Sequence, residues 1–204
     1  FLPGLLALAD RFNPPGRPPI RLAITEWGVL GRWGDSRPVV ENYGEVPYAG
    51  VYLNMAVRRA ERIPIHNATA LLHGGCIRKA GGQVFYDPQI TVIRQYTLLA
   101  GGTPLRCEVQ SPTYDTRVVP DLGLPLENVP YLDGAAVEQP GRLTVCLVNR
   151  HRHRAMKVRV KRAGSQRAAA RWTYLAYPDI TARARLGDPG RFALQEGQPL
   201  EQDG

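Results

Sequence analysis

The sequence is poor in cysteine and has no long apolar run. Its three cysteines, Cys76, Cys107 and Cys146, are odd in number and widely spaced. That pattern fits neither a disulfide framework nor a zinc site, so we interpret them as small buried apolar residues. Charge or glycine interrupts every apolar run within ten residues, which predicts that no segment crosses a membrane.

The start of the chain lacks the marks of a mature or secreted N-terminus. It opens on Phe1-Leu2-Pro3, with no initiator methionine, no basic leader and no cleavage site. This is typical of an internal piece of a longer protein. Any signal peptide would precede Phe1, and we assume a cytoplasmic location.

Lysine is scarce, since three of the 26 basic residues are lysines and the rest are arginines. The net charge of +8 raises the possibility of nucleic-acid binding, and the densest basic run lies at residues 150–162. Within it Met156, Val158 and Val160 alternate with charged residues, which predicts a strand over Lys157–Lys161 with a solvated basic face. Aromatic side chains that could stack on bases are not interleaved there, so we favour a solvated sheet face and expect no nucleic-acid partner.

Histidine and glycine do not form a metal or phosphate site in the sequence. The four histidines have no ligand spacing with cysteine or carboxylates. The pairs Gly74-Gly75 and Gly101-Gly102 lack the downstream residues of a phosphate-binding loop. We therefore expect no metal ion and no cofactor.

The first hundred residues alternate helical and strand patterns. Apolar periodicity and breakers predict helices at 2–12, 48–62 and from Pro88 with Asp87 as N-cap, strands at 21–27 and 65–72, and a loop at 81–88. The order α-β-α-β-α is typical of a parallel barrel or a doubly wound sheet.

From Pro104 the pattern changes to short strands separated by turns. We expect strands at 105–109, 134–138, 143–148, 157–161 and 171–177, with a hairpin turn at 139–142. Such a series favours an antiparallel β-sandwich. The predicted fold class is thus α/β plus all-β, with domains at 1–102 and 103–204. The tail from Ala182 offers little to pack.

Glu26 is the candidate functional residue. It ends a short apolar run and is followed by Trp27 and Gly28, and the run predicts a strand buried in a parallel sheet. In a barrel of parallel strands the carboxyl ends of the strands form the active-site face. Taken alone, Glu26 is either catalytic or a surface carboxylate, and Trp27 either faces a sugar ring or shields the carboxylate. A long loop that contains Trp33 follows.

Several motifs in this order resemble the α-L-arabinofuranosidases of glycoside hydrolase family 51. They cover roughly residues 22–161 and are fairly specific only together. The motifs are Ile24-Thr25-Glu26-Trp27-Gly28-Val29, the helix end Arg58-Arg59-Ala60-Glu61-Arg62-Ile63, Gly82-Gln83-Val84-Phe85-Tyr86-Asp87-Pro88, Gln110-Ser111-Pro112-Thr113-Tyr114-Asp115, Val129-Pro130-Tyr131-Leu132-Asp133 and Leu143-Thr144-Val145-Cys146-Leu147-Val148-Asn149-Arg150.

The resemblance implies the last two βα units of a (β/α)₈ TIM barrel, followed by a C-terminal β-sandwich. It also implies a retaining hydrolase that removes terminal α-L-arabinofuranosyl residues from polysaccharides or oligosaccharides, and that is a homo-oligomer at full length. Glu26 matches the nucleophile and Gln83 a glutamine that contacts arabinose, while the acid/base glutamate lies upstream of Phe1. Thr25 and Leu30 depart from the acidic and aromatic residues usual in the family. Either Trp33 is the sugar platform instead or the substrate preference differs, and the alternative for Trp33 is simple packing.

Three functions stay open at this stage. The first is part of a retaining arabinofuranosidase or of another retaining glycosidase of the same barrel type. The second is a carbohydrate-binding or structural remnant without turnover, and the third is a nucleic-acid binder. For the first we expect the strands near Trp27 and Ile65 to pair in parallel, and Glu26 and Gln83 to lie close together.

Overall fold

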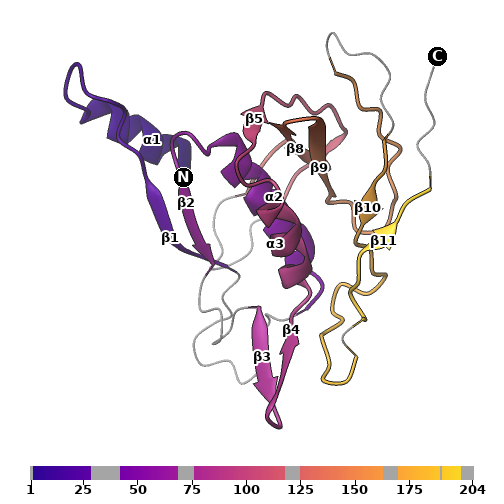
Figure 1. Ribbon diagram of the computed structural model, residues 1–204. Helices are drawn as coiled ribbons and strands as arrows, with labels where there is room; N and C mark the ends of the chain where they lie inside the picture. Colours follow the sequence, from indigo (N-terminus) through magenta and orange to yellow (C-terminus); the bar gives the residue numbers. More distant parts are fainter. Residues whose placement is uncertain are drawn as a thin grey trace.

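A computed structural model describes residues 2–28, 42–68, 76–117, 125–162, 170–188 and 190–198, and shows a mixed α/β fold (Figure 1). The elements in chain order are α1 (Leu2–Arg11), β1 (Ala23–Trp27), α2 (Glu45–Arg58), β2 (Ile65–Ala68), β3 (Ile77–Ala80), β4 (Gln83–Tyr86), α3 (Gln89–Thr97), β5 (Thr103–Leu105), β6 (Thr113–Tyr114), β7 (Val129–Pro130), β8 (Leu132–Gln139), β9 (Arg142–Asn149), β10 (Thr173–Tyr174) and β11 (Gln195–Glu196).

The predicted parallel pair is confirmed, because β1 and β2 are hydrogen-bonded in parallel and α2 lies between them in sequence. The expectation of a strand buried on both faces is wrong. Ala23, Thr25 and Glu26 are exposed, whereas Trp27 is buried and Ile24 half-buried. Helix α1 precedes the pair as predicted, and Asp10 binds Arg62 at the entry to β2 (2.6 Å).

The loop expected at 81–88 is instead the second half of a β-hairpin. Strands β3 and β4 pair antiparallel, with Ala80 opposite Gln83 across the two-residue turn Gly81-Gly82. Both glycines have positive φ (+55° and +76°), which is the requirement of a tight type I′ turn. Helix α3 then begins at Gln89 with Pro88 as its N-cap, one residue later than predicted.

The strands after residue 102 pair antiparallel, as expected. The central sheet has the order β5-β8-β9, and the predicted turn at 139–142 joins β8 to β9, with Gly141 at φ +69°. Helices α2 and α3 lie side by side between this sheet and the β1–β2 pair (Figure 1). Gly50 lets α2 approach β9, because a Cβ on it would lie 2.7 Å from Val148 Cγ2.

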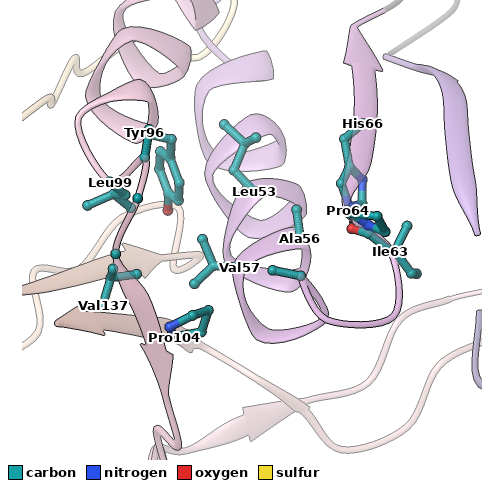
Figure 2. Close-up of a pocket in the computed structure, with 14 residues that line it drawn as sticks. Leu53, Ala56, Val57, Ile63, Pro64, His66, Tyr96, Leu99, Pro104 and Val137 are labelled. Carbon is teal, nitrogen blue, oxygen red and sulfur yellow. Dashed lines mark hydrogen bonds between the residues drawn. The ribbon is translucent and has the colours of Figure 1, made fainter. Parts of the chain in front are cut away.

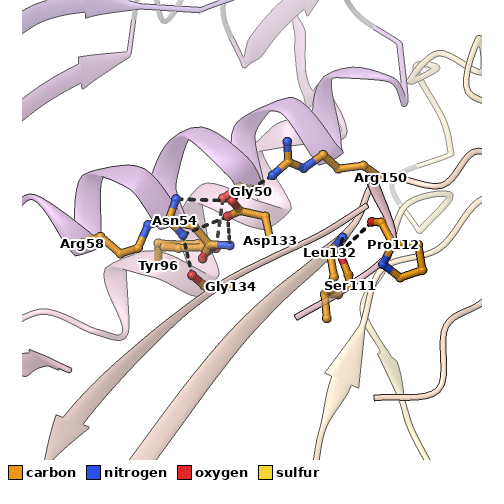
Figure 3. A network of polar contacts seen from close by, with 10 residues as sticks. All are labelled: Gly50, Asn54, Arg58, Tyr96, Ser111, Pro112, Leu132, Asp133, Gly134 and Arg150. Atoms are coloured by element: carbon orange, nitrogen blue, oxygen red, sulfur yellow. Dashed lines mark hydrogen bonds and ion pairs between the residues drawn. The ribbon is translucent and has the colours of Figure 1, made fainter. Parts of the chain in front are cut away.

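A buried polar network joins the two helices to the sheet (Figure 3). Asn54 on α2 is fully buried; its amide donates to Asp133 Oδ1 on β8 (2.8 Å), and its Oδ1 accepts from the Tyr96 hydroxyl on α3 (2.6 Å). Arg58 and Arg150 pair with the same aspartate (3.1 and 3.0 Å), and Arg58 also donates to the Gly134 carbonyl. Burial raises the pKa of Tyr96, which keeps its hydroxyl a donor.

The C-terminal segment packs, contrary to the expectation for the tail. Ala182 and Phe192 form a buried cluster with Tyr43 and Val46 at the start of α2. The Tyr43 and Gly44 amides donate to the carbonyls of Ala182 and Ile180 (2.8 Å each). The average composition of the tail hid these contacts, because it does not show that Phe192, Ala182 and Ala184 pack against one cluster.

The strand predicted at Lys157–Lys161 is also wrong. Residues 155–162 form no regular element, and Val158 and Val160 remain exposed. Alternating apolar and charged residues form a strand only where a neighbouring strand pairs with them and an apolar surface packs against their apolar side. No helix in the described part of the chain is long and apolar enough to cross a membrane.

Candidate active site

Glu26 lies in a β-bulge near the carboxyl end of β1. In the register of the parallel pair Ile24 is opposite His66, and Trp27 is opposite Ala68. Thr25 and Glu26 therefore stand opposite a single residue of β2. An extra residue of this kind bends the strand and re-aims a side chain, and such bulges are over-represented beside active sites.

The bulge divides the side chains of the pair between two faces. Residues in register project to the same side of a sheet, and side chains alternate along a strand. Ile24, Trp27, His66 and Ala68 lie on the side covered by α2 and are buried or half-buried. Glu26, by contrast, is exposed on the opposite side. We call that side, with Ala23, Thr25, Glu26, Ile65 and Asn67, the open face.

Trp27 is anchored against α2. Its ring stacks on Tyr52 with centroids 4.2 Å apart and an interplanar angle of 13°, and only 7% of the residue is exposed. The next residue, Gly28, accepts a hydrogen bond from the Tyr48 hydroxyl (3.2 Å). The two residues after Glu26 are thus both attached to the same helix.

His66 connects that aromatic cluster to β2. Its Nε2 lies 2.9 Å from the Ile63 carbonyl and must donate, because a carbonyl only accepts. Its Nδ1 therefore accepts from the Tyr52 hydroxyl at 2.8 Å. Burial lowers the pKa of His66 and raises the pKa of Tyr52 to about 12, so both side chains are neutral at pH 7.

Gln83 and Trp33 are the other two predicted sugar-binding residues. Gln83 is the first residue of β4 beside the hairpin turn, and its side chain is exposed. Trp33 lies outside the described residues. The expected proximity of Glu26 and Gln83 therefore stays a prediction.

A cavity of about 460 Å³ opens between α2, α3 and the start of β5 (Figure 2). Of the 14 described residues that line it, only His66 and Tyr96 carry polar side chains. The rest is apolar, with Leu53, Val57, Leu99 and Val137 among them. Since Glu26 does not line this cavity, we do not assign it to the candidate active site.

The roles of Tyr52 and His66 beside Trp27 were missed from the sequence. Tyr48 and Tyr52 are four residues apart on one helix, and a histidine interrupts the next apolar run; these were the signals available. Which face of the pair each residue would take depended on the bulge, and no local motif marks it.

No three His, Cys, Asp or Glu side chains within the six described ranges are grouped so as to hold a metal ion. Cys76 is buried, as predicted, whereas Cys107 and Cys146 are half-buried, and all three are free thiols. An exposed carboxylate at the end of a parallel strand can act as a nucleophile or a base.

Several solved structures that the chain resembles are arabinofuranosidases. The chain matches the α-L-arabinofuranosidase from Thermotoga maritima in its arabinose complex with a TM-score of 0.73 and 21% identity, over 87% of this chain and 38% of that one. It matches the GH51 enzyme from Thermotoga petrophila RKU-1 with a TM-score of 0.76 and 22% identity, over 89% and 39%. For the GH51 enzyme from Xanthomonas axonopodis pv. citri the values are 0.67 and 18%, over 87% and 36%.

The sequence itself matches no protein-family profile and no curated protein. The chain spans less than two-fifths of the length of the enzymes whose structures it matches. The likeness therefore rests on the fold, over nearly nine-tenths of this chain. The protein has the fold of a part of the GH51 α-L-arabinofuranosidases, as the resemblance of its motifs implied.

Proposed function

We propose that this chain is the C-terminal portion of a retaining α-L-arabinofuranosidase and that Glu26 is its nucleophile. One observation carries the proposal. Glu26 stands in a bulge at the carboxyl end of a parallel strand, exposed on the face opposite the covering helix. In (β/α)₈ barrels the catalytic residues come from the carboxyl ends of the strands, and the helices cover the outside.

This proposal gives the two halves of the chain different roles. Residues 1–102 would supply the last two βα units of the barrel, with the open face of β1 and β2 turned to its interior. Residues 103–204 would form the β-sandwich, and the antiparallel order β5-β8-β9 supports that assignment. The rest of the barrel would come from residues outside this chain.

The reaction would be a double displacement. The Glu26 carboxylate attacks the anomeric carbon while an acid on another strand protonates the leaving oxygen, so a glycosyl ester forms as the glycosidic bond breaks. The same acid, now a base, takes a proton from water, which attacks the anomeric carbon and releases Glu26. In retaining enzymes the two carboxyl groups lie about 5–5.5 Å apart. The acid/base residue would be supplied from outside the chain.

Terminal arabinofuranosyl groups are the proposed substrate. Gln83 would bind a sugar hydroxyl, and Trp33 would offer an aromatic platform. For Trp27, the stack on Tyr52 favours the shielding interpretation over direct contact with the sugar, because one ring face is already covered.

The test compares the 204-residue chain alone with the combined enzyme, by which we mean this chain together with the segment that would supply the rest of the barrel. Alone it should not cleave an aryl α-L-arabinofuranoside, because loss of general acid–base assistance costs roughly 10²–10⁴-fold. Combined, in one chain or as two, it should cleave. Glu26→Gln should abolish cleavage, since an amide cannot form the ester, while the control Glu61→Gln, at an exposed site outside the open face, should not.

Two results would contradict the proposal. One is turnover at enzyme rates by the isolated chain. The other is full activity of the combined Glu26→Gln protein. Binding of an arabino-oligosaccharide without turnover by the combined protein would favour the non-catalytic remnant.

A further inference from the structure

We infer that Tyr52 and His66 are positioning residues that hold the bulge carrying Glu26 in its catalytic geometry by fixing Trp27. The inference rests on the proposed function, because it concerns the placement of the proposed nucleophile. Neither residue lies on the open face, so neither touches the sugar. Their effect would pass through Trp27, the residue next to Glu26.

The first support is that both ends of the bulge are tied to one tyrosine. On its carboxyl side Trp27 stacks on the ring of Tyr52 (4.2 Å). On its amino side Ile24 pairs with His66, whose Nδ1 accepts a hydrogen bond from the Tyr52 hydroxyl (2.8 Å). Thr25 and Glu26 are thus spanned by contacts that converge on a single side chain of α2.

The second support is the direction of the hydrogen bonds. The Ile63 carbonyl holds the Nε2 proton of His66, which leaves Nδ1 as the acceptor for Tyr52. Protonation would turn Nδ1 into a donor. The Tyr52 hydroxyl would then lose its acceptor, and a charge would appear where the ring is half-buried. Neutral His66 is therefore the form that orients Tyr52.

The third support is that α2, which carries Tyr52, is itself held firmly. Two residues further along the helix Asn54 is fully buried and bound to both Asp133 and Tyr96. Tyr52 is thus mounted on a fixed helix, and movement at His66 would be transmitted to Trp27 and the bulge. The edge contact of Tyr52 with the His66 ring, at 5.6 Å and 82°, adds a second tie between them.

Other titratable groups occur on the elements around His66. Glu26 lies on the neighbouring strand but on its other face, and Tyr96 lines the same cavity from α3. The remaining groups lie on α2 and its connection to β2 and are Glu45, Tyr48, Tyr52, Arg58, Arg59, Glu61 and Arg62. Among all of these His66 alone has an ordinary pKa between 5 and 8, so a transition in that range reports on it.

The test reads Trp27 directly in the 204-residue chain. Trp33→Phe and Trp172→Phe leave Trp27 as the one tryptophan, and its near-UV circular dichroism and its quenching by acrylamide are followed from pH 8 to pH 5. We expect the dichroism to fall and the quenching to rise on acidification. His66→Asn keeps an acceptor near the Nδ1 position and cannot titrate, so it should retain the high-pH signal at every pH. Tyr52→Phe should show the weakened signal at every pH.

His151→Gln is the matched control. Its Nδ1 also accepts, from the backbone amides of His153 and Arg154 (3.1 Å each), but it lies in the segment after β9. That variant should keep the pH transition of Trp27. A transition that persists in His66→Asn, or one that is absent from the parent protein, would overturn the inference.

Turnover gives the second readout. In the combined enzyme His66→Asn should remove an acid limb from the pH profile of kcat, and Tyr52→Phe should lower kcat by up to about 100-fold with little change in KM, because a shift of about 1 Å in a reacting group can cost that much. Unchanged kcat in Tyr52→Phe would contradict the inference. Failure of Glu26→Gln to abolish turnover would instead overturn the proposed function, and it would leave the Trp27 spectra unaffected.

Discussion

The two regions on either side of α2 differ in how far their side chains are buried and paired. Toward β8 and β9 the helix meets a buried sheet face, and its polar groups Asn54 and Arg58 are bound to Asp133. Toward β1 and β2 it covers one side of a two-stranded pair, whose other side stays exposed with Glu26 on it. The first region contains its own partners, whereas under the proposed function the rest of the barrel would cover the exposed side of the second. Stability and the proposed chemistry are therefore carried by different residues.

The largest expected effect on stability comes from breaking the buried network. Asp133→Ala would remove the acceptor that Asn54, Arg58 and Arg150 share. Removing one partner of a fully buried ion pair costs about 3–5 kcal/mol. Because the Arg58 and Arg150 side chains are 32% and 20% exposed, we expect a loss at the lower end of that range. Urea unfolding followed by circular dichroism measures the free energy of unfolding.

Glu138→Ala on the same strand is the control for that change. Its pair with Arg162 (2.7 Å) is nearly half exposed, so its loss should cost less than about 1 kcal/mol. Equal losses in the two variants would show that the network does not hold the helices to the sheet.

A smaller loss is expected where α2 touches β9. Gly50→Ala should cost about 1–3 kcal/mol, since the new methyl group would overlap Val148 Cγ2. The second change Val148→Ala should recover part of that loss. Gly4→Ala, in α1 with nothing within 4 Å of the added Cβ, should be neutral or stabilising. Thermal unfolding of the three variants tests this, and a Gly50→Ala protein as stable as its parent would contradict the close approach.

On the other side of the helix, His66 should make stability depend on pH. Its folded pKa is lowered from the ordinary 6.5, so the folded state binds fewer protons than the unfolded state between those two values. The free energy of unfolding should fall as the pH drops below about 6.5, until the folded pKa is passed. His66→Asn should flatten that part of the curve, as measured by urea unfolding at several pH values. An unchanged slope would assign the dependence to other groups.

The smallest effect is expected at the open face itself. Because Glu26 is exposed, Glu26→Gln should change the free energy of unfolding by less than about 0.5 kcal/mol. Urea unfolding next to the parent chain tests this. A loss of several kcal/mol would make Glu26 a structural carboxylate and remove the contrast between the two regions.

Local patterns predicted the elements well where burial and turn chemistry agree. The parallel pair, the helix at 2–12 and the hairpin turn at 139–142 follow from apolar periodicity and from Gly141. The hairpin at Gly81-Gly82 was mistaken for a loop, although a glycine pair between two short runs is its usual signal. The strand predicted at Lys157–Lys161 was wrong, because alternating apolar and charged residues do not show whether a partner strand is present.

The candidate site was predictable in part. Glu26 could be singled out because a carboxylate that ends an apolar run is uncommon. Its place in a bulge could not, since a bulge is defined by the register with a strand some forty residues away. The roles of Tyr52 and His66 depend on the same register. The seating of Phe192 and Ala182 against Tyr43 was likewise hidden, because it is a contact between distant segments.

The most direct test of Glu26 as nucleophile is to locate the glycosyl ester. The combined enzyme is mixed with an aryl α-L-arabinofuranoside that has an activated leaving group, quenched in acid within one turnover, digested and mapped by mass spectrometry. We expect one added pentosyl group on the peptide that contains Glu26, and none in Glu26→Gln. A pentosyl group on another carboxylate, or direct inversion at the anomeric carbon with no ester, would contradict it.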